Sequence, residues 1–370
     1  MTRLHVETLQ GFTLPEDLPL RRDYNFPEAE RSALYLERYD RRTLFYDAVR
    51  LPGSGHLLLT APPLYNLRAR LRRGLHDGGR PVGRGLRHWQ TPQAELMTLR
   101  RRVQAPELVL DGTRHPLPVR ESRAEMFAGL NCMVVLNRDN DPDWIAASVD
   151  YHIRAHGLQG VLIFDNGSVT YTAEALAGRL AAVPGLEALA VYRVPFSFGP
   201  PLKSRKDRTN PRFLQPALLN LARREILSRA RAVLNVDPDE IIRSKGGASV
   251  FDRAVARRHT MVKIHGSWVL PPPGTPLPAP QSAHTHREVP NQRCNQKWCA
   301  VPGGMLGRFG WAVHHVGGRF VRLVGATPDL ELLHCRGTST GWKSKRFELP
   351  AATREDPALA EFFRRWFPND

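Results

Sequence analysis

From residue 131 onward, short apolar runs alternate with longer segments of helical spacing. Four runs are continuous in apolar residues, as strands buried on both faces are. They lie at 132–136, 160–164, 186–194 and 231–236. The segments predicted as helices lie between them, at 142–156, 173–183 and about 213–230. Strands that alternate with helices of this length form βαβ units, so we expect an α/β fold with a mainly parallel, Rossmann-like sheet and flanking helices.

The first of these helices has well-marked ends. Asp141 is a favourable N-cap residue, and Pro142 suits the first helical position because its missing N–H would have no partner there. Gly157 suits the position after the last helical residue, where the chain commonly turns left-handed. These signals predict a helix over 142–156.

The rest of the chain has a different pattern. Residues 1–125 contain short β-like runs, such as 43–51 and 55–62, joined by turn residues, which predicts a small β-rich N-terminal domain. Residues 271–280 are rich in proline and predict an extended loop. We therefore expect a β-rich accessory domain at 1–125, an α/β domain at 126–346 and a C-terminal helix and tail at 347–370.

The chain is strongly basic, with a net charge of +17 and a pI of about 10.4. Such a charge indicates either anionic partners, such as a pyrophosphate ligand, an acidic polymer or an anionic membrane surface, or a solvated basic surface that is simply rich in arginine. No RNP-like, helix-turn-helix or zinc-finger pattern is present, so no nucleic acid is expected as a partner, and a nucleic-acid-binding protein is the weaker alternative. Without a signal peptide or a membrane-spanning apolar run, the sequence predicts a cytoplasmic protein, with a peripheral position at the inner face of the membrane as an open alternative.

The four cysteines do not predict a disulfide framework in a chain of 370 residues. Cys294 and Cys299 are one residue too far apart for the usual zinc knuckle. A metal site that combines them with His284 and His286 remains a minor alternative.

The strongest local signal is Asp237-Pro238-Asp239, directly after the fourth apolar run. Proline restricts the residue before it to extended conformations, and in an extended chain residues i and i+2 face the same side. Asp237 and Asp239 are therefore expected to converge and to form an oxygen-rich site for Mg²⁺ or Mn²⁺. A polar turn after a strand is the alternative.

A second signal, Asp165-Asn166-Gly167-Ser168, follows the second apolar run. Ligands of parallel sheets bind at the carboxyl ends of the strands, where both Asp165 and Asp237 are expected. Taken alone, this sequence also fits an ordinary Asn-Gly turn.

In their order, these motifs resemble the catalytic region of glycosyltransferase family 2-like and family 92 proteins. The resemblance covers about 131–345 and rests on a strand followed by Asn137, an acidic-Trp helix with a Tyr-His pair, a D-N-x-S turn and a D-x-D-E motif. Those residues are Asn137, Asp143-Trp144, Tyr151-His152, Asp165-Asn166-Gly167-Ser168 and Asp237-Pro238-Asp239-Glu240. Later matches are Gln296-Lys297-Trp298, His314-His315 and Leu332-Leu333-His334. The family's K-N-E element departs here, because it reads Asn137-Arg138-Asp139 and only Asp139 could replace the glutamate.

The resemblance implies a GT-A fold and an enzyme that transfers a sugar from a nucleotide-sugar donor, a UDP- or GDP-sugar first, to a glycan or other hydroxyl acceptor, with Mn²⁺ or Mg²⁺, in surface polysaccharide synthesis. It places Asn137, Asp165 and Asn166 at the nucleotide and Asp237 at the ribose or sugar. The metal would be bound by Asp237 and Asp239, with His315 or His334 completing the metal or pyrophosphate site. A non-catalytic scaffold protein with a degenerate site is the remaining alternative.

Two further groups have expected roles in such a transfer. A general base must deprotonate the acceptor hydroxyl, and Glu288 is favoured over Asp329 and Glu331 because it follows the proline-rich loop. Lys203 and Arg205 lie in a cationic run suited to the donor diphosphate.

Overall fold

The computed structural model describes residues 1–200, 210–318, 320, 324–339 and 347–367. The chain forms two compact units, each assembled from separate segments. Unit 1 comprises Met1–Glu7, Met126–Val194 and Leu227–Asp370, and unit 2 comprises Thr8–Glu125 and Pro195–Ile226. These units differ from the expected domains in two segments. The first seven residues, expected in the N-terminal domain, belong to unit 1, and residues 195–226, expected in the α/β domain, belong to unit 2. Lys203 and Arg205 lie outside the described residues.

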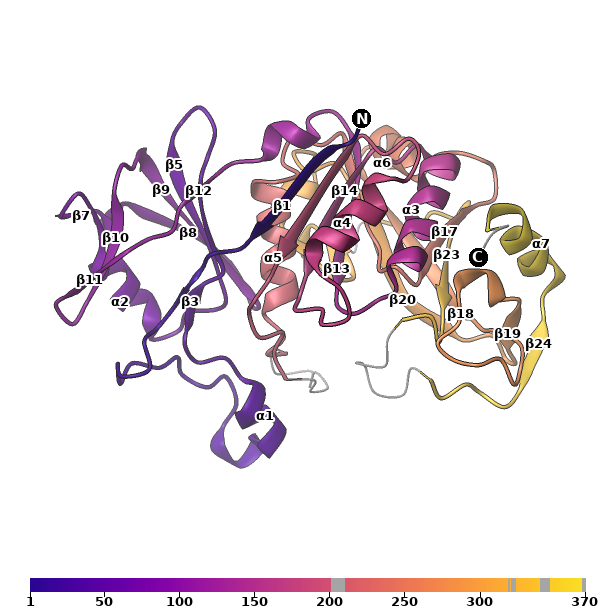
Figure 1. The fold of residues 1–370 in the computed structure, drawn as a ribbon, viewed down its shortest axis with the longest axis horizontal. Helices are drawn as coiled ribbons and strands as arrows, with labels where there is room; N and C mark the ends of the chain where they lie inside the picture. Colours follow the sequence, from indigo (N-terminus) through magenta and orange to yellow (C-terminus); the bar gives the residue numbers. More distant parts are fainter. Residues whose placement is uncertain (201–209, 319, 321–323, 340–346, 368–370) are drawn as a thin grey trace. The chain divides into compact units, whose positions relative to one another are not determined.

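Unit 1 is built on a nine-stranded sheet in the order β1-β15-β14-β13-β16-β20-β18-β23-β17 (Figure 1). The strands are β1 (Arg3–Thr8), β13 (Asn131–Asn137), β14 (Gly160–Asp165), β15 (Ala188–Arg193), β16 (Ala232–Asn235), β17 (Glu240–Ser244), β18 (Met261–Val269), β20 (Arg293–Ala300) and β23 (Leu330–Cys335). Strands β15, β14, β13 and β16 are mutually parallel, as their four apolar runs predict.

The other half of this sheet contradicts the expectation of a mainly parallel sheet. β20 runs antiparallel to both β16 and β18, and β17 runs antiparallel to β23, so the sheet is mixed. Parallel neighbours need a long crossover connection, usually a helix. β18 and β23 are parallel neighbours, and in the described part of the chain their connection passes through β19, β20, β21 and β22 with no α-helix.

Helices cover this sheet and complete the core of unit 1. They are α3 (Pro142–His156), α4 (Ala173–Ala181), α6 (Val250–Ala256) and α7 (Pro357–Trp366). α3 packs beside α4, and α6 packs on β16, β18 and β20. Ile163, Leu176 and Leu234 are fully buried between these layers. The apolar runs thus form the centre of the sheet, and their carboxyl ends lie at its edge.

The predicted ends of α3 are confirmed. The side chain of Asp141 accepts a hydrogen bond from the N–H of Asp143, and Pro142 opens the helix. Gly157 has a φ of 70°, the left-handed conformation that favours glycine.

Unit 2 contains a five-stranded sheet in the order β12-β4-β5-β9-β8 and a four-stranded sheet in the order β11-β10-β6-β7. The first comprises β4 (Asp47–Arg50), β5 (His56–Ala61), β8 (Leu86–Thr91), β9 (Ala94–Arg102) and β12 (Arg120–Glu121). The second comprises β6 (Leu75–Asp77), β7 (Arg80–Pro81), β10 (Pro106–Leu110) and β11 (Thr113–Pro116). A further pair is formed by β2 (Phe12–Thr13) and β3 (Thr43–Phe45), and the helices are α1 (Ala33–Arg38), α2 (Leu67–Gly74) and α5 (Leu214–Arg224).

The placement of α5 differs from the expected βαβ arrangement. The sequence predicts a helix that covers the parallel sheet, but α5 packs on β5 and β9 of unit 2. An ionic contact also ties its end to unit 2, because Arg120 donates to Asp47 at 2.8 Å and to Glu225 at 2.6 Å. All three groups are almost inaccessible to water, so each charge needs its partner.

In the described parts of both units, no helix combines the length and the apolar character that crossing a membrane requires.

The ends of the helices allow a matched test of backbone conformation. We expect Gly157→Ala to lower the free energy of unfolding by about 1 kcal/mol, because alanine is strained at this positive φ. Steric clash would not contribute, since the nearest atom to an added Cβ is 4.0 Å away. The control is Gly178→Ala within α4, which has open space around it and should stabilise by about 0.5–1 kcal/mol. Urea unfolding of both variants measures whether each change lowers or raises the free energy of unfolding. Equal effects of the two variants would contradict the left-handed conformation assigned to Gly157.

Candidate active site

The polar residues singled out in the sequence gather at the carboxyl ends of neighbouring parallel strands. Asn137 ends β13 and is paired in register with Asp165 at the end of β14. Asp237 follows β16, which lies on the other side of β13. The chain proceeds from β13 to β14 and β15 in one direction and then returns to β16, so β13 and β16 flank a topological switch point. Such points are the usual ligand sites of open α/β sheets.

Asp165 is held by a network of hydrogen bonds. The Asn137 amide donates to Asp165 Oδ1 at 2.8 Å, and the Ser168 hydroxyl and backbone N–H also donate to this carboxylate. The same Asn137 amide lies 2.8 Å from the Tyr171 hydroxyl. Asn166 is buried too, and its amide donates to the carbonyl of Val194. The D-N-x-S turn therefore presents Asp165 in a fixed orientation.

Asp139, the only possible substitute for the glutamate of the K-N-E element, is committed to the same turn. Its Oδ1 accepts from the N–H of Val169 at 2.6 Å and from the N–H and hydroxyl of Thr170. Its own N–H donates to Ser168 Oγ. In this structure, Asp139 organises the loop after β14.

Asp237-Pro238-Asp239-Glu240 forms a tight turn, so the extended run that was expected from Asp237 to Asp239 is wrong. The N–H of Glu240 donates to the carbonyl of Asp237 at 3.0 Å, which closes the turn. The Glu240 carboxylate in return accepts from the N–H of Asp237 at 2.7 Å. Proline at the second position favours a β-turn, and this preference prevails after the strand has ended. Asp237 and Asp239 consequently do not share a face through strand alternation.

A lysine from another strand organises the carboxylates of this turn. The Lys297 ammonium, on β20, lies 3.1 Å from Asp237 Oδ2 and 2.8 Å from Glu240 Oε2. The Lys297 side chain is 0% exposed, whereas that of Asp237 is 19% exposed. Asp237 is therefore the member of this ion-paired group that a ligand from solvent can reach.

Burial and pairing act in opposite directions on this group. Burial by itself lowers the pKa of Lys297, but the carboxylates of Asp237 and Glu240 outweigh it and hold that pKa above its ordinary value. Burial raises the pKa of Glu240, and the Lys297 ammonium opposes that shift. Lys297 consequently remains charged at neutral pH.

His334 extends the cluster from β23. Its Nε2 lies 3.4 Å from Asp239 Oδ2, and its Nδ1 lies 3.5 Å from Glu240 Oε1. Trp268, on β18, stacks against the imidazole with ring centroids 4.0 Å apart. We call Asp237, Asp239, Glu240, Lys297 and His334 the carboxylate cluster. It joins residues from a turn and two strands that are distant in sequence.

Glu240 and Lys297 were not assigned a role in the sequence, although both lie in matched motifs. The available signal was a lysine inside the apolar end of a strand, next to Trp298 and Cys299. A lysine at such a position needs a buried carboxylate partner. Finding that partner required knowing that β20 lies beside β16.

The remaining predicted residues lie away from the carboxylate cluster. His315 is exposed on β22 (His315–Val316), which pairs with β21 (Trp311–Ala312). Glu288 is on β19 (His286–Glu288), which pairs with β24 (Thr353–Glu355). Of the alternative bases, Glu331 pairs with Arg243 and Arg287, and Asp329 pairs with Arg253.

Metal ligation has one local candidate in the cluster. Asp239 and His334 offer an oxygen and a nitrogen on facing side chains, whereas Asp237 Oδ2 is paired with Lys297. Within the described ranges, no group of three or more His, Cys, Asp or Glu side chains is placed to hold a metal ion. The alternative site around Cys294 and Cys299 has lost a ligand, because both nitrogens of His284 are hydrogen-bonded to backbone carbonyls.

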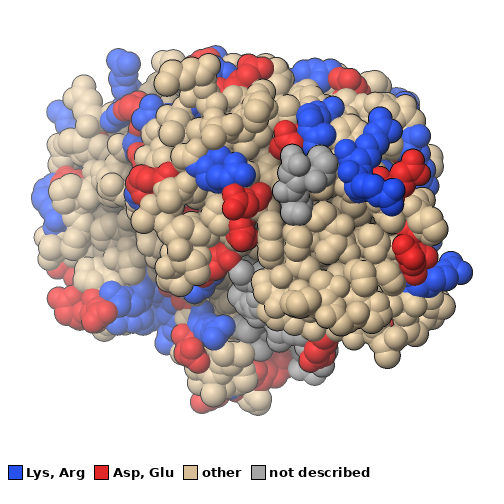
Figure 2. Space-filling model, turned by 45° about the vertical axis from the view of Figure 1, so that its right-hand side comes forward, with Lys and Arg blue, Asp and Glu red and all other residues tan. Residues whose placement is uncertain are grey.

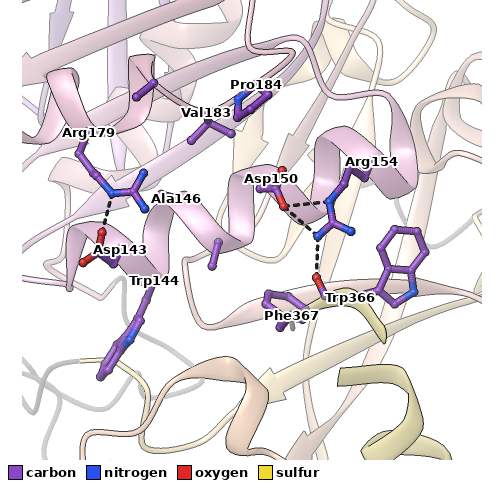
Figure 3. A pocket seen from close by; sticks show the side chains of 12 residues that line it. Asp143, Trp144, Ala146, Asp150, Arg154, Arg179, Val183, Pro184, Trp366 and Phe367 are labelled. Atoms are coloured by element: carbon purple, nitrogen blue, oxygen red, sulfur yellow. Dashed lines mark hydrogen bonds and ion pairs between the residues drawn. The ribbon is translucent and has the colours of Figure 1, made fainter. Parts of the chain in front are cut away.

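A separate pocket of about 640 Å³ lies between α3, the end of α4 and the C-terminal end of α7 (Figure 3). Its charged side chains are paired with each other or with the backbone. Arg179 pairs with Asp143, and Arg154 contacts both Asp150 and the carbonyl of Trp366. The charges that line this pocket therefore neutralise one another.

No known protein-family profile matches the chain, and no curated protein matches it. Parts of several solved structures are similar to it, among them the following three. The mannosyltransferase Ktr4p from S. cerevisiae is 12% identical, with a TM-score of 0.25 over 38% of this chain and 39% of that chain. TarS from S. aureus is 15% identical, with a TM-score of 0.23 over 41% and 23% of the respective chains. Its 1–349 fragment is 14% identical, with a TM-score of 0.24 over 47% of each chain. The chain thus spans less than half of each of these structures, and likeness at these scores does not define its activity.

The buried ammonium predicts a pH-dependent loss of stability. We expect Lys297→Met to lower the free energy of unfolding by about 3–5 kcal/mol at pH 8, because two carboxylates lose their buried partner. A carboxyl group whose folded-state pKa is raised favours folding at low pH and loses this contribution as pH rises through that pKa. Burial raises the pKa of Glu240, and loss of the opposing Lys297 ammonium should raise it further in the variant, so the deficit relative to the parent protein should be smaller at pH 5 than at pH 8.

Urea unfolding at both pH values measures the effect of Lys297→Met. Lys245→Met removes an exposed ammonium and should leave the midpoint almost unchanged. A Lys297→Met deficit that is constant with pH would show that lost packing, and not the ion pairs, causes it.

Proposed function

We propose that this protein is a glycosyltransferase that takes a sugar from a UDP- or GDP-sugar to a hydroxyl of a glycan acceptor in surface polysaccharide synthesis. The supporting observation is the carboxylate cluster beside Asn137 and Asp165, at the switch point of the parallel strands. Asp165 would accept hydrogen bonds from the nucleoside. Asp237, the most accessible carboxylate of the Lys297 pair, would contact the ribose or the sugar.

We propose that a divalent cation is held jointly by the cluster and the donor. Mg²⁺ is commonly bound by one or two carboxylates, with substrate phosphates and water supplying the other ligands. Asp239 and His334 would supply two protein ligands for Mn²⁺ or Mg²⁺, and Asp237 would border the site. Once bound, the ion would neutralise the diphosphate as a leaving group.

The transfer itself requires a proton acceptor. As the acceptor oxygen bonds to the anomeric carbon, the bond from that carbon to the diphosphate oxygen breaks, and the hydroxyl proton passes to a base. Glu288 is our proposed base only for an acceptor bound beside β19 and β24, because Glu288 lies on that pair and away from the carboxylate cluster. Glu331 is less suited, since two arginines engage it. Although burial raises the pKa of Glu331, Arg243 and Arg287 hold it below its ordinary value, which makes it a weak proton acceptor.

The donor site can be tested by calorimetric titration of UDP and of GDP, each with and without Mn²⁺. We expect one nucleotide to bind in a metal-dependent manner, and Asp239→Asn to abolish the metal-dependent part because a carboxylate ligand is lost. Asp252→Asn is the matched control, since Asp252 lies on α6 and pairs with Arg231. A folded protein that binds neither nucleotide with Mn²⁺ or Mg²⁺ would count against the proposed donors.

A second variant separates nucleoside contacts from the metal. Asp165→Asn replaces an acceptor of hydrogen bonds, so we expect nucleotide affinity to fall about tenfold or more. The fold-change should be similar in the presence and absence of Mn²⁺, because Asp165 lies outside the carboxylate cluster. The same calorimetric series measures it, and loss of metal dependence alone would contradict this division of roles.

A further inference from the structure

Unit 2 contains a cavity of about 670 Å³ with a strongly basic lining. This volume lies within the range of pockets that bind small ligands. Five arginines line it, together with apolar residues and glycine, and its lining contains no acidic residue. They are Arg72, Arg84, Arg87, Arg100 and Arg101, and we call this site the arginine cavity.

The five guanidinium groups differ in their partners from the arginines of unit 2 that are paired with carboxylates. All five side chains belong to exposed residues, and among the described residues none of them forms an ion pair with a carboxylate. Arg72 donates only a weak hydrogen bond, at 3.3 Å, to the carbonyl of Arg84. In contrast, Arg70 pairs with Asp111 and Arg114 pairs with Glu107. The charge of the arginine cavity is therefore available to a ligand.

The backbone brings two of these arginines together through a close approach. The short 3-10 helix η2 (Gly83–Gly85) packs on α2 so tightly that a Cβ at Gly83 would lie 1.9 Å from the carbonyl oxygen of Arg72. Only glycine permits this contact. Arg84 is thereby held next to Arg72.

A break in strand pairing directs two more arginines outward. β9 pairs with β5 through Leu99↔Leu57 and then through Arg102↔His56. Moving from Leu57 to the adjacent His56 on β5 therefore corresponds to moving three residues along β9, from Leu99 to Arg102. Arg100 and Arg101 are the extra residues of this β-bulge. Bulges interrupt the alternation of side chains and redirect them, so both consecutive arginines are exposed.

Elsewhere in the protein, and unlike in the arginine cavity, basic side chains lie close to acidic ones. On the face drawn in Figure 2, acidic side chains lie interspersed among the lysines and arginines. The pocket of Figure 3 likewise pairs its arginines with aspartates. A concave site with five arginines and no acid in its lining is a distinct feature of unit 2.

We propose that the arginine cavity binds a flexible acidic polymer whose units carry phosphate or carboxylate groups. Guanidinium groups bind both oxyanions through paired N–H donors. The lining contains no aromatic residue on which a nucleic-acid base could stack. Its hollow form suits a chain that can bend into it better than it suits a flat membrane surface. This site is independent of the proposed donor site, so either proposal can fail without the other.

Fluorescence anisotropy of the full chain with labelled linear polyphosphate and polygalacturonate tests the proposal. The cavity variant combines Arg84→Gln, Arg100→Gln and Arg101→Gln. The control combines Arg38→Gln, Arg70→Gln and Arg114→Gln, which removes the same charge from arginines that pair with carboxylates. We expect the cavity variant to weaken binding of at least one polymer about tenfold at low salt and to reduce its salt dependence, and the control to change it less than about twofold.

Three results would overturn this assignment. Absence of binding of both polymers at low salt would remove the site, and equal weakening by the two variants would show a nonspecific effect of total charge. Tighter binding of single-stranded DNA or of anionic phospholipid vesicles than of either polymer, lost in the cavity variant, would assign these arginines to a nucleic acid or to a membrane instead.

Discussion

The buried ammonium of Lys297 is the constraint on which the candidate site depends. A charge without solvent is tolerated only beside opposite charges, so β20 and the turn after β16 must lie in register for Lys297 to meet Asp237 and Glu240. The same turn positions Asp239 towards His334 on β23. One ion-paired group therefore connects the parallel half of the sheet, which carries Asn137 and Asp165, to its mixed half.

Charge has two different uses in this chain. Where it is buried and paired, as in Arg120 with Asp47 and Glu225, it specifies how elements of one unit pack. Where it is exposed and unpaired with carboxylates in the described structure, as in the arginine cavity, it is available to a partner. A net charge of +17 does not distinguish these uses, because it counts every arginine equally. Only the surroundings of each side chain show whether its charge stabilises the fold or is available to bind a partner.

The sequence predicted the parts of unit 1 whose signals are local. The strands β13 to β16 and the ends of α3 follow from apolar runs, a capping aspartate and a left-handed glycine, all readable within a few residues. The mixed half of the sheet and the packing of α5 in unit 2 were not predictable in this way, because strand order and the partner of an amphipathic helix depend on distant segments. Asp237 and Asp239 were singled out by their motif, but the strand-like alternation expected between them is absent, since a turn preference of Pro238 prevails once the ladder ends.

The sequence by itself determined which chemical groups were at hand: carboxylates after two strands, a late histidine, and arginine in excess. Tertiary structure decided which of them meet. It placed His334 with Asp239, placed His315 and Glu288 on other sheets, and supplied Lys297 as the partner that the carboxylates of the turn required. The physical reason is that hydrogen-bonding and apolar patterns act over a few residues, whereas a buried charge is satisfied only by the whole fold that surrounds it.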